Sequence, residues 1–488
     1  MDVKTKFNAV VIALLLLIMS VLGAVALTRT ITDTGDTVDT YIINSNGKYY
    51  TATYANFLSA YYDLNSTGGW VNLPACNLTV IFSLILVNNT EIRGSGVDNT
   101  ILFLDDAANC AMILAGRTSS GVDWAESNGG RHHVKITGIT FDMNNDSQTW
   151  NQWYQTIGLA ANSNNITIRD CLFKNSVTDS IHQYNGASQT IPQETLIVED
   201  CVFINTQRKV GDYPGGVFIC GRFNKVSRCH FKDTWACGVI FEGDNFPNYC
   251  RYNTVSDCTF TGVVSTGVWM EGNKGSNNTA INNHIFNINS SAYAAATNVY
   301  SRAMVLAQHD CVINSNTINN VTDYIYISGM RCVFSNNIIT NVVGGHASNT
   351  ERGDAIYLVS TPTGTDISNC IFKGFTRYGV LAKSKVDIIG CTFIGGIRGI
   401  SISSMNNVTV SNCKFFGQSS DGIMCYTAVD CQILGNNCDT DGDGIQSTGT
   451  PMYNQIIGNN CRNSATPFNL KVNVSSNITY NIGTVTWS

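Results

Sequence analysis

Short segments of alternating apolar and polar residues recur along most of this chain and end in the same pair of residue types. A Cys or Asn is followed two positions later by an aromatic or aliphatic residue, as in Cys171-Leu-Phe173 and Cys201-Val-Phe203. Successive segments are spaced by roughly 21 to 33 residues, with the shortest spacing after Asn337. A repeat of this length predicts a solenoid in which each repeat contributes one coil.

The apolar residues of these segments alternate with a period of two and are mostly β-branched or aromatic. This pattern excludes a helical solenoid and predicts strands. A second short segment of the form Gly-Ile-x-Ile lies between them, for example at Gly238–Phe241, Gly267–Met270 and Gly399–Ile402. Two or three strands per coil, stacked coil on coil, predict an all-β, single-stranded parallel β-helix.

Stacking places equivalent positions of neighbouring coils one strand spacing apart, about 4.8 Å. The repeats therefore predict inward stacks of Cys171, Cys201, Cys229 and Cys258, of Cys370, Cys391 and Cys413, and of the phenylalanines from Phe173 to Phe415. Buried cysteine packs as a small hydrophobic residue. Cys311 and Cys332 open corresponding strands and are the best candidates for a disulfide between adjacent coils.

Residues 1–26 have the features of a signal peptide. Lys4 and Lys6 precede an apolar run over residues 9–22, and Ala24-Val25-Ala26 has the small-x-small form of a cleavage site. An uncleaved anchor is the alternative, because the run approaches the ~18 residues that span a bilayer. Either interpretation predicts a secreted or cell-surface protein, with residues 27–70 as an N-terminal segment with a capping helix and residues 71–488 as the β-helix.

Two further features agree with export. The 18 cysteines fit an oxidising compartment, where disulfides persist. N-glycosylation sequons are frequent, although a chain rich in Asn, Ser and Thr also produces them by chance. They occur at Asn65, Asn77, Asn88, Asn145, Asn165, Asn277, Asn289, Asn320, Asn407, Asn473 and Asn477. Only 13% of residues are charged and the net charge of -6 includes no basic cluster, which argues against nucleic-acid binding.

Four stretches near the N-terminus resemble the pectate-lyase-like right-handed β-helix proteins of the pectin lyase superfamily, which include relatives of polygalacturonases and phage tail-spikes. They are residues 41–50, 68–74, 86–103 and 134–141. The resemblance implies a right-handed coil and a short helix that caps the coil stack, here at residues 53–64. It specifies the fold rather than the activity, because the family includes lyases, hydrolases, epimerases, adhesins and structural proteins.

The resemblance to family hydrolases is incomplete. Those enzymes combine an Asn-Thr-Asp segment with an Asp-Asp pair, a Gly-His-Gly and an Arg-x-Lys, whereas here Asp439-Thr-Asp441 only partly matches the first. This argues against a polygalacturonase. Asp439, Asp441 and Asp443 also have the spacing of a calcium loop, although Thr450 stands where the acidic twelfth residue is expected. No cofactor is required, and calcium is the one candidate.

The best candidate catalytic pair is Glu242 and Glu271, which follow equivalent second strands in consecutive coils. Stacked carboxylates about 5 Å apart suit the acid and nucleophile of a retaining glycosidase. The alternative is a solvated face whose charge Lys274 offsets. Asp179 and His182 are a weaker candidate pair for a lyase. Other aspartates that precede second strands are interpreted as turn-capping residues, namely Asp323, Asp354, Asp421 and Asp443.

An outward column of apolar and aromatic residues follows the second strands. It comprises His182, Phe218, Ile240, Trp269, Met304, Tyr326, Tyr357, Leu381 and Met424. Soluble monomers seldom leave such a stripe bare. The stripe is interpreted as a groove where sugars stack, as an interface with another subunit, or as a surface covered by long turns.

Two hypotheses follow. The first is a non-catalytic surface glycoprotein, such as an adhesin or sheath component, which binds polysaccharide or cell-envelope components and associates with itself. The second is a polysaccharide lyase or glycoside hydrolase. Neither requires nucleic acid, and contact with a membrane is expected only through an uncleaved N-terminal anchor.

Overall fold

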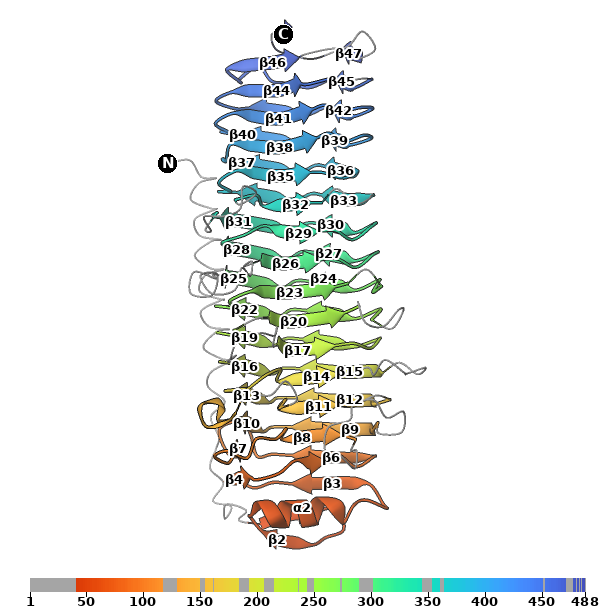
Figure 1. Cartoon of the computed structure of the whole chain (residues 1–488), viewed down its shortest axis with the longest axis vertical. Coiled ribbons are helices and arrows are strands. Elements are labelled where there is room, and N and C mark those ends of the chain that lie inside the picture. The colour runs from red at the N-terminus through yellow and green to blue at the C-terminus, as the bar shows by residue number, and fades with distance from the viewer. Residues whose placement is uncertain are drawn as a thin grey trace, which may run out of the picture. The chain divides into compact units, whose positions relative to one another are not determined.

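The computed structural model describes residues 41–116, 130–149, 154–160, 162–183, 193–205, 215–235, 237–243, 250–272, 274–288, 302–344, 353–359, 364–450, 453–470, 477–479, 481, 483 and 485–487. These residues form a stack of coils with a helix under its first coil (Figure 1). The predicted signal peptide at residues 1–26 lies outside the described residues. Among the described residues, no helix has the length and apolar character needed to cross a membrane.

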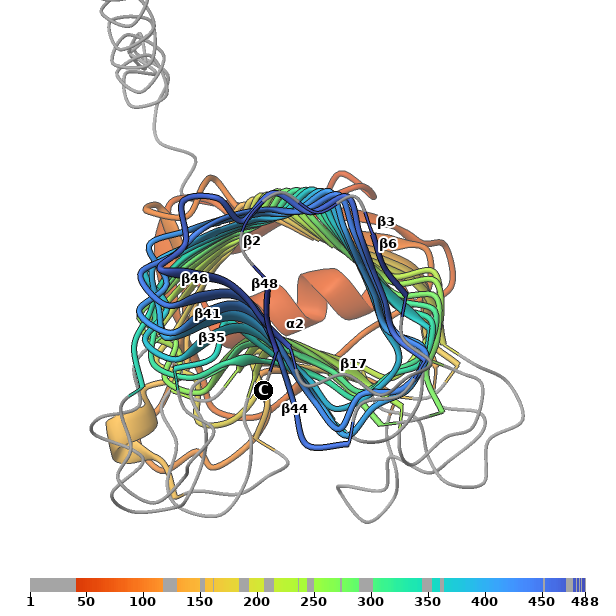
Figure 2. The same ribbon diagram turned by 90° about the horizontal axis from the view of Figure 1, so that it is seen from above.

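Three long sheets run along the stack, and each coil from β3 to β44 contributes one strand to each of them (Figures 1 and 2). Strand pairs within the sheets are parallel, except that β1 pairs antiparallel with β2 and β3. The strands of sheet A are β1 Tyr41–Asn44, β2 Tyr49–Thr51, β3 Gly69–Asn72, β6 Thr90–Arg93, β9 His132–Thr137, β12 Asn164–Arg169, β15 Glu194–Glu199, β18 Lys225–Ser227, β21 Thr254–Ser256, β24 Thr279–Ile281, β27 Val312–Asn314, β30 Val333–Ser335, β33 Thr365–Ser368, β36 Val386–Ile389, β39 Thr409–Ser411, β42 Gln432–Leu434, β45 Gln455–Ile457 and β47 Asn477–Thr479.

Sheet B consists of β4 Cys76–Val80, β7 Thr100–Leu104, β10 Thr140–Asp142, β13 Leu172–Lys174, β16 Val202–Ile204, β19 His230–Lys232, β22 Thr259–Thr261, β25 His284–Ile288, β28 Thr317–Val321, β31 Ile338–Val342, β34 Ile371–Lys373, β37 Thr392–Ile394, β40 Lys414–Phe416 and β43 Asn437–Asp439. A 3-10 helix, η1 Asn145–Ser147, follows β10.

Sheet C consists of β5 Leu84–Ile85, β8 Ile113–Ala115, β11 Ile157–Leu159, β14 Ile181–Gln183, β17 Gly215–Ile219, β20 Cys237–Glu242, β23 Thr266–Glu271, β26 Arg302–Leu306, β29 Ile325–Ile327, β32 Ile356–Leu358, β35 Tyr378–Ala382, β38 Arg398–Ser403, β41 Asp421–Tyr426, β44 Asp443–Thr448, β46 Thr466–Leu470 and β48 Val485–Trp487. The predicted all-β parallel β-helix is confirmed.

The predicted capping helix is present as α2 Tyr54–Tyr62. The Thr53 hydroxyl accepts a hydrogen bond from the Asn56 backbone N–H, which satisfies one of the free donors at the helix N-terminus. Phe57 and Tyr61 are fully buried against the first coils. The Tyr61 hydroxyl lies 2.7 Å from that of Thr90, and burial raises the pKa of Tyr61 to about 12. The helix thereby closes one end of the apolar core (Figure 2).

A single residue in the left-handed conformation turns the chain from sheet A to sheet B in coil after coil. Asp170, Asp200, Asp257 and Asn282 occupy this position with φ between 52° and 56°. Asn, Asp and Gly adopt this conformation at the lowest cost, which explains why these residues precede the Cys or Asn of the repeat. The turn then directs the next side chain into the core.

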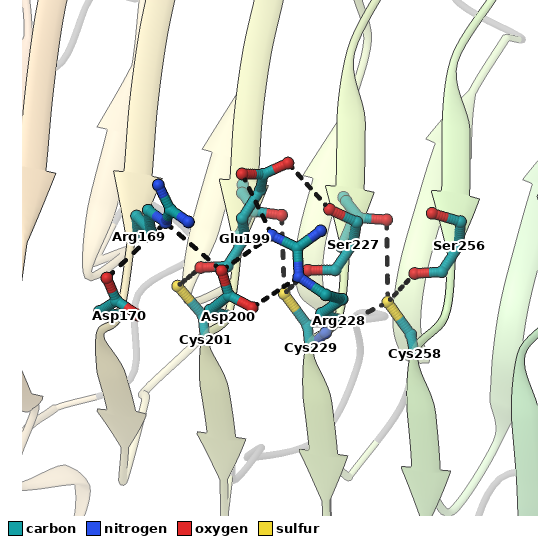
Figure 3. Close-up of polar contacts among 12 residues, drawn as sticks. Arg169, Asp170, Glu199, Asp200, Cys201, Ser227, Arg228, Cys229, Ser256 and Cys258 are labelled. Carbon is teal, nitrogen blue, oxygen red and sulfur yellow. Dashed lines mark hydrogen bonds and ion pairs between the residues drawn. The ribbon is translucent and has the colours of Figure 1, made fainter.

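The strand register confirms inward stacks, but it divides the predicted phenylalanine stack into two runs, because Ile285, Ile318 and Ile339 lie between Phe260 and Phe372. Phe173, Phe203 and Phe231 are aligned, with ring centroids 4.9 and 4.6 Å apart and nearly parallel planes. Cys201, Cys229 and Cys258 lie side by side on neighbouring coils, as Figure 3 shows. Their S–H groups point at backbone carbonyl oxygens, with Cys201 Sγ 3.1 Å from the Glu199 oxygen.

Asparagine takes the place of cysteine where the stack continues through Asn283, Asn316 and Asn337. The Asn316 side-chain amide donates to the Ala280 carbonyl at 3.0 Å, and its oxygen accepts from the Asn283 backbone N–H at 2.9 Å. Asn337 repeats both contacts one coil later. Each amide thus satisfies backbone groups that the turn leaves without a sheet partner.

The predicted disulfide between Cys311 and Cys332 is wrong, because none of the 18 cysteines is bonded to another in the structure. Cys311 and Cys332 do occupy equivalent positions in adjacent coils. In a parallel stack, however, side chains point in the same direction at a spacing of about 4.8 Å. A disulfide requires Cβ atoms about 3.5–4.5 Å apart with converging Cβ–S bonds.

We expect 18 thiols to react with iodoacetamide when the chain is unfolded without a reductant, since none is consumed in a disulfide. In the folded protein only a small fraction should react, because 16 of these thiols are buried. Burial also raises the pKa of the Cys250 thiol to about 12, which keeps it un-ionised and unreactive. Intact-mass measurement of both samples checks this, and a deficit of two reactive thiols after unfolding would reveal a disulfide.

Ion pairs link neighbouring coils on the outer side of the same turn (Figure 3). Arg228 Nε lies 2.7 Å from Asp200 Oδ1, and Lys225 Nζ lies 2.8 Å from Glu199 Oε1. Hydrogen bonding from Arg228 lowers the pKa of Asp200, so the folded state holds this carboxylate ionised at lower pH than the unfolded chain does. Its stabilising contribution is therefore present above about pH 4 and lost as the pH falls through the folded-state pKa.

Asp200→Asn should lower the free energy of unfolding at pH 7 by about 0.5 kcal/mol, since the pair is partly solvent-screened. Asn tolerates the left-handed φ of 54° at this position, so the backbone is not the cause. Urea denaturation between pH 2 and 7 measures the difference, which should vanish at the acid end and shrink in 1 M NaCl. A difference that persists at pH 2 would contradict the electrostatic origin.

Candidate functional site

The outer face of sheet C carries the predicted apolar and aromatic column. The strand register aligns His182 with Phe218, then Ile240, Trp269, Val305, Tyr326, Tyr357 and Leu381. Met304, which the sequence placed in this column, is instead aligned with Val268 and is fully buried in the core. Val305 takes its place, because a shift of one residue moves a side chain to the opposite face of a strand.

The column is less exposed than the sequence predicted. His182, Phe218, Trp269 and Tyr326 are half-buried. Other members are buried, with 0% exposure for Ile240, 8% for Tyr357 and 5% for Leu381. The column is therefore divided into two apolar clusters that leave some rings partly accessible, instead of one bare stripe.

The first cluster, the Trp269 cluster, comprises Phe218, Cys237, Ile240 and Trp269. The His182 ring stacks on Phe218 with centroids 4.5 Å apart and an interplanar angle of 4°. Asp179 Oδ2 lies 2.7 Å from His182 Nδ1, and Asp179 Oδ1 accepts from the Gly215 backbone N–H. The carboxylate thus fixes the orientation of the imidazole, as a positioning group does in an acid–base pair.

Carboxylates surround the Trp269 cluster. Glu242 and Glu271 occupy equivalent outward positions on β20 and β23, as predicted, with Glu242 buried and Glu271 half-buried. Burial raises the pKa of the nearby Cys237 thiol well above its usual range, and the charges of Glu271 and Asp179 raise it further. This part of the face is acidic, and the backbones of Glu242 and Glu271 lie one strand spacing apart, about 4.8 Å.

The second cluster, the tyrosine cluster, comprises Tyr324, Tyr326, Tyr357 and Leu381, with Tyr378 packed against it. The Arg302 guanidinium lies 4.9 Å from the Tyr324 ring centroid and 4.5 Å from that of Tyr326. Arg302 Nη2 also donates to the Tyr324 hydroxyl at 3.0 Å.

Lys383 makes the corresponding contacts with Tyr357. Its Nζ lies 5.0 Å from the ring centroid and donates to the hydroxyl at 3.2 Å. Cation–π contacts of this kind hold both the rings and the charges in place.

The aspartates that precede the second strands bind side chains from their own coil or from a neighbouring one. Arg377 Nε lies 2.7 Å from Asp354 Oδ1, and the Asp354 side chain is fully buried. Arg398 pairs with Asp421 in the same way. Asp443 accepts from Gln446 Nε2 at 2.7 Å and from Asn469 Nδ2 at 2.9 Å. The sequence predicted that these aspartates cap backbone N–H groups, and it did not predict these side-chain contacts.

The structure does not bring the three predicted calcium ligands together. Asp443 faces Gln446 and Asn469, whereas Asp439 ends β43 on the exposed side and Asp441 is exposed in the turn. In the part of the chain that the structure describes, no group of three or more His, Cys, Asp or Glu side chains is arranged to hold a metal ion.

Most sequons lie at the surface. The exposed sequon asparagines are Asn65, Asn77, Asn88, Asn165, Asn320 and Asn407. Asn277 is half-buried, and Asn289, Asn473 and the side chain of Asn477 lie outside the described residues. Asn145 is 8% exposed within η1, so the folded chain does not present its amide for modification.

Arg302, Lys383 and Tyr324 were not predicted from the sequence. Arg302 opens β26, and its alignment with Thr266 places it beside the tyrosine cluster. The intervals between repeats before and after Arg302 are long, so the spacing of the repeats did not predict the strand register of Arg302. The one available signal was the Tyr324-Ile-Tyr326 segment, which predicts two outward-facing tyrosines on one strand.

Comparisons with known proteins agree with this architecture. The family model described as a right-handed β-helix region matches residues 215–393 and 346–483, which together cover more than half of the chain. No curated protein matches the chain.

Two phage proteins are among the similar solved structures. A tailspike protein mutant of E. coli bacteriophage HK620, in complex with a hexasaccharide, has a TM-score of 0.54 and 14% identity over 83% of this chain and 71% of its own. The N-terminal fragment of gene product 12 of bacteriophage phi29 has a TM-score of 0.53 and 13% identity over 82% of this chain and 78% of its own. At this identity the likeness concerns the fold alone. The family match shows that the chain belongs to the proteins with a right-handed β-helix region.

Proposed function

We propose that this chain is an exported β-helix protein that binds a polysaccharide along the outer face of sheet C. The observation that carries the proposal is the row of partly accessible rings at Trp269 and Tyr326, bordered by fixed carboxylates and cations. Flat aromatic rings stack on the apolar faces of sugars. Charged groups accept hydrogen bonds from sugar hydroxyls or donate hydrogen bonds to them. The hexasaccharide bound to the similar HK620 tailspike supports this direction.

Within this proposal the protein acts at the cell surface, where a stiff column of coils presents the binding face to polysaccharide or envelope components. Native gel electrophoresis through gels containing xylan, laminarin, dextran or polygalacturonate tests binding directly. Retardation by at least one polymer is expected. Unchanged migration in all four gels would argue against the proposal.

The alternative is a retaining glycosidase that uses Glu242 and Glu271. It is favoured by their equivalent positions on adjacent strands, whose backbones are about 4.8 Å apart, because retaining enzymes need two closely spaced carboxyl groups. Incubation with the same polymers, followed by a reducing-end assay, distinguishes the two functions. Cleavage that Glu271→Gln abolishes while binding persists would establish the enzyme, and binding without cleavage would leave the non-catalytic function.

A further inference from the structure

A second column of left-handed residues runs along the corner that leads from sheet C into sheet A. The residues in this column lie just before the sheet A strands of successive coils or at the second position of the strand. They include Asn165, Thr195, Phe223, Tyr252, Asn277, Asp310, Arg331, Asn407, Asp430 and Tyr453, with φ between 54° and 59°. Most members are polar, and several are Asn or Asp, which tolerate this conformation. Phe223, Tyr252 and Tyr453 are the aromatic exceptions.

The backbone and the solvent both disfavour an aromatic residue at this position. A bulky side chain at positive φ is strained, and Phe223 and Tyr252 remain 48% and 50% exposed, so burial in the core does not compensate. Strain that the fold does not need is most common at functional sites. The same backbone strain occurs in two consecutive coils, at Phe223 and at Tyr252. This distinguishes the pair from a single exposed ring.

The two rings form a platform. Phe223 and Tyr252 are stacked with centroids 5.4 Å apart and an interplanar angle of 7°. The Arg222 guanidinium lies 5.4 Å from the Phe223 ring centroid, and Arg222 forms an ion pair with Glu194. Flat apolar surface is therefore bordered by fixed hydrogen-bond donors and acceptors, the combination that recognises a sugar ring with its apolar face and equatorial hydroxyls.

We propose that Phe223 and Tyr252, with Arg222 and Glu194, form a second carbohydrate site that takes one pyranose unit of a polysaccharide. A protein partner is a poorer fit, since two rings offer far less area than the ~800 Å² per partner of a stable interface. This site stands on its own contacts and does not depend on the proposed binding face of sheet C.

The test replaces both rings by the residue type that the same column uses elsewhere. Phe223→Asn/Tyr252→Asn should raise the unfolding temperature, because Asn relieves the strain at positive φ. It should also weaken retention in the four polysaccharide gels about tenfold through loss of the stacking surface. Tyr453→Asn is the matched control: Tyr453 is 54% exposed at φ 55° in the same column and has no stacked ring among the described residues. It should raise stability without changing retention.

The outcomes separate this site from the face of sheet C. Loss of retention in the corner variant alone supports the second site, and loss only on replacing Trp269 and Tyr326 overturns it while leaving the first proposal. Unchanged migration of the wild type in every gel overturns both. Self-association in analytical ultracentrifugation that the corner variant abolishes, without any polysaccharide binding, would assign the platform to a second copy and overturn the carbohydrate assignment.

Discussion

Alanine at both Trp269 and Tyr326 is expected to weaken retention by the bound polysaccharide about a hundredfold. Each ring supplies stacking surface on the outer face of sheet C, and the loss of about 1.4 kcal/mol per ring corresponds to a factor of ten. Both side chains are half-buried and point away from the core, so the coils beneath them should remain folded. Affinity electrophoresis at several polymer concentrations gives the dissociation constants.

A matched control is available on the same sheet. Tyr426, at the end of β41, is 48% exposed but lies outside both clusters. Tyr426→Ala should leave retention unchanged. If Tyr426→Ala weakened binding as much as the double variant, retention would not depend on the two clusters. The outer face of sheet C would then not be the binding site. Thermal unfolding of both variants and of the wild type verifies that each remains folded.

The coil stack was predictable because its signal is repeated. Cys201 and Phe203 recur with the same two-residue spacing in many segments, and parallel stacking then determines which residues become neighbours. The left-handed turn residue before each Cys or Asn adds a second constraint on register. A wrong register assignment in one coil is corrected by the coils on either side, because all of them share the same spacing.

Predictions failed where a coil departs from the repeat. β26 has no Gly before its apolar run of Ala303, Met304 and Val305, so sequence alone allows either alternation phase. Structure resolves the phase because Arg302 aligns with Thr266. Cation–tyrosine contacts such as that between Lys383 and Tyr357 join coils 26 residues apart and require the register before they can be recognised.

The cysteine prediction failed for a different reason. Export and 18 cysteines suggested disulfides, but the repeat places cysteine where the turn needs a small inward side chain. Asn316 at the same position shows the second solution, in which the amide satisfies the Ala280 carbonyl and the Asn283 backbone N–H of the preceding coil. This position requires a small side chain that points into the core. Stacked side chains that point in the same direction do not converge into disulfides.

Phe203→Ala should lower the free energy of unfolding by about 4 kcal/mol, the range for removal of a fully buried phenylalanine. Phe203 is 0% exposed and stacks on Phe173 and on Phe231, so its removal opens a cavity between two rings that neighbouring coils hold apart. The sheet spacing prevents those rings from closing the gap, because each is fixed to its own strand.

Phe416→Ala provides the comparison, since Phe416 is half-buried on the outward side of β40 and its removal should cost well under half as much. Guanidinium denaturation followed by circular dichroism measures both variants. In a solenoid each coil contacts only its neighbours, so the weakened coils should also unfold before the rest and broaden the transition. Equal costs for the two variants would mean that the phenylalanine stack does not hold the coils together, because an outward ring would then stabilise the fold as much as an inward one.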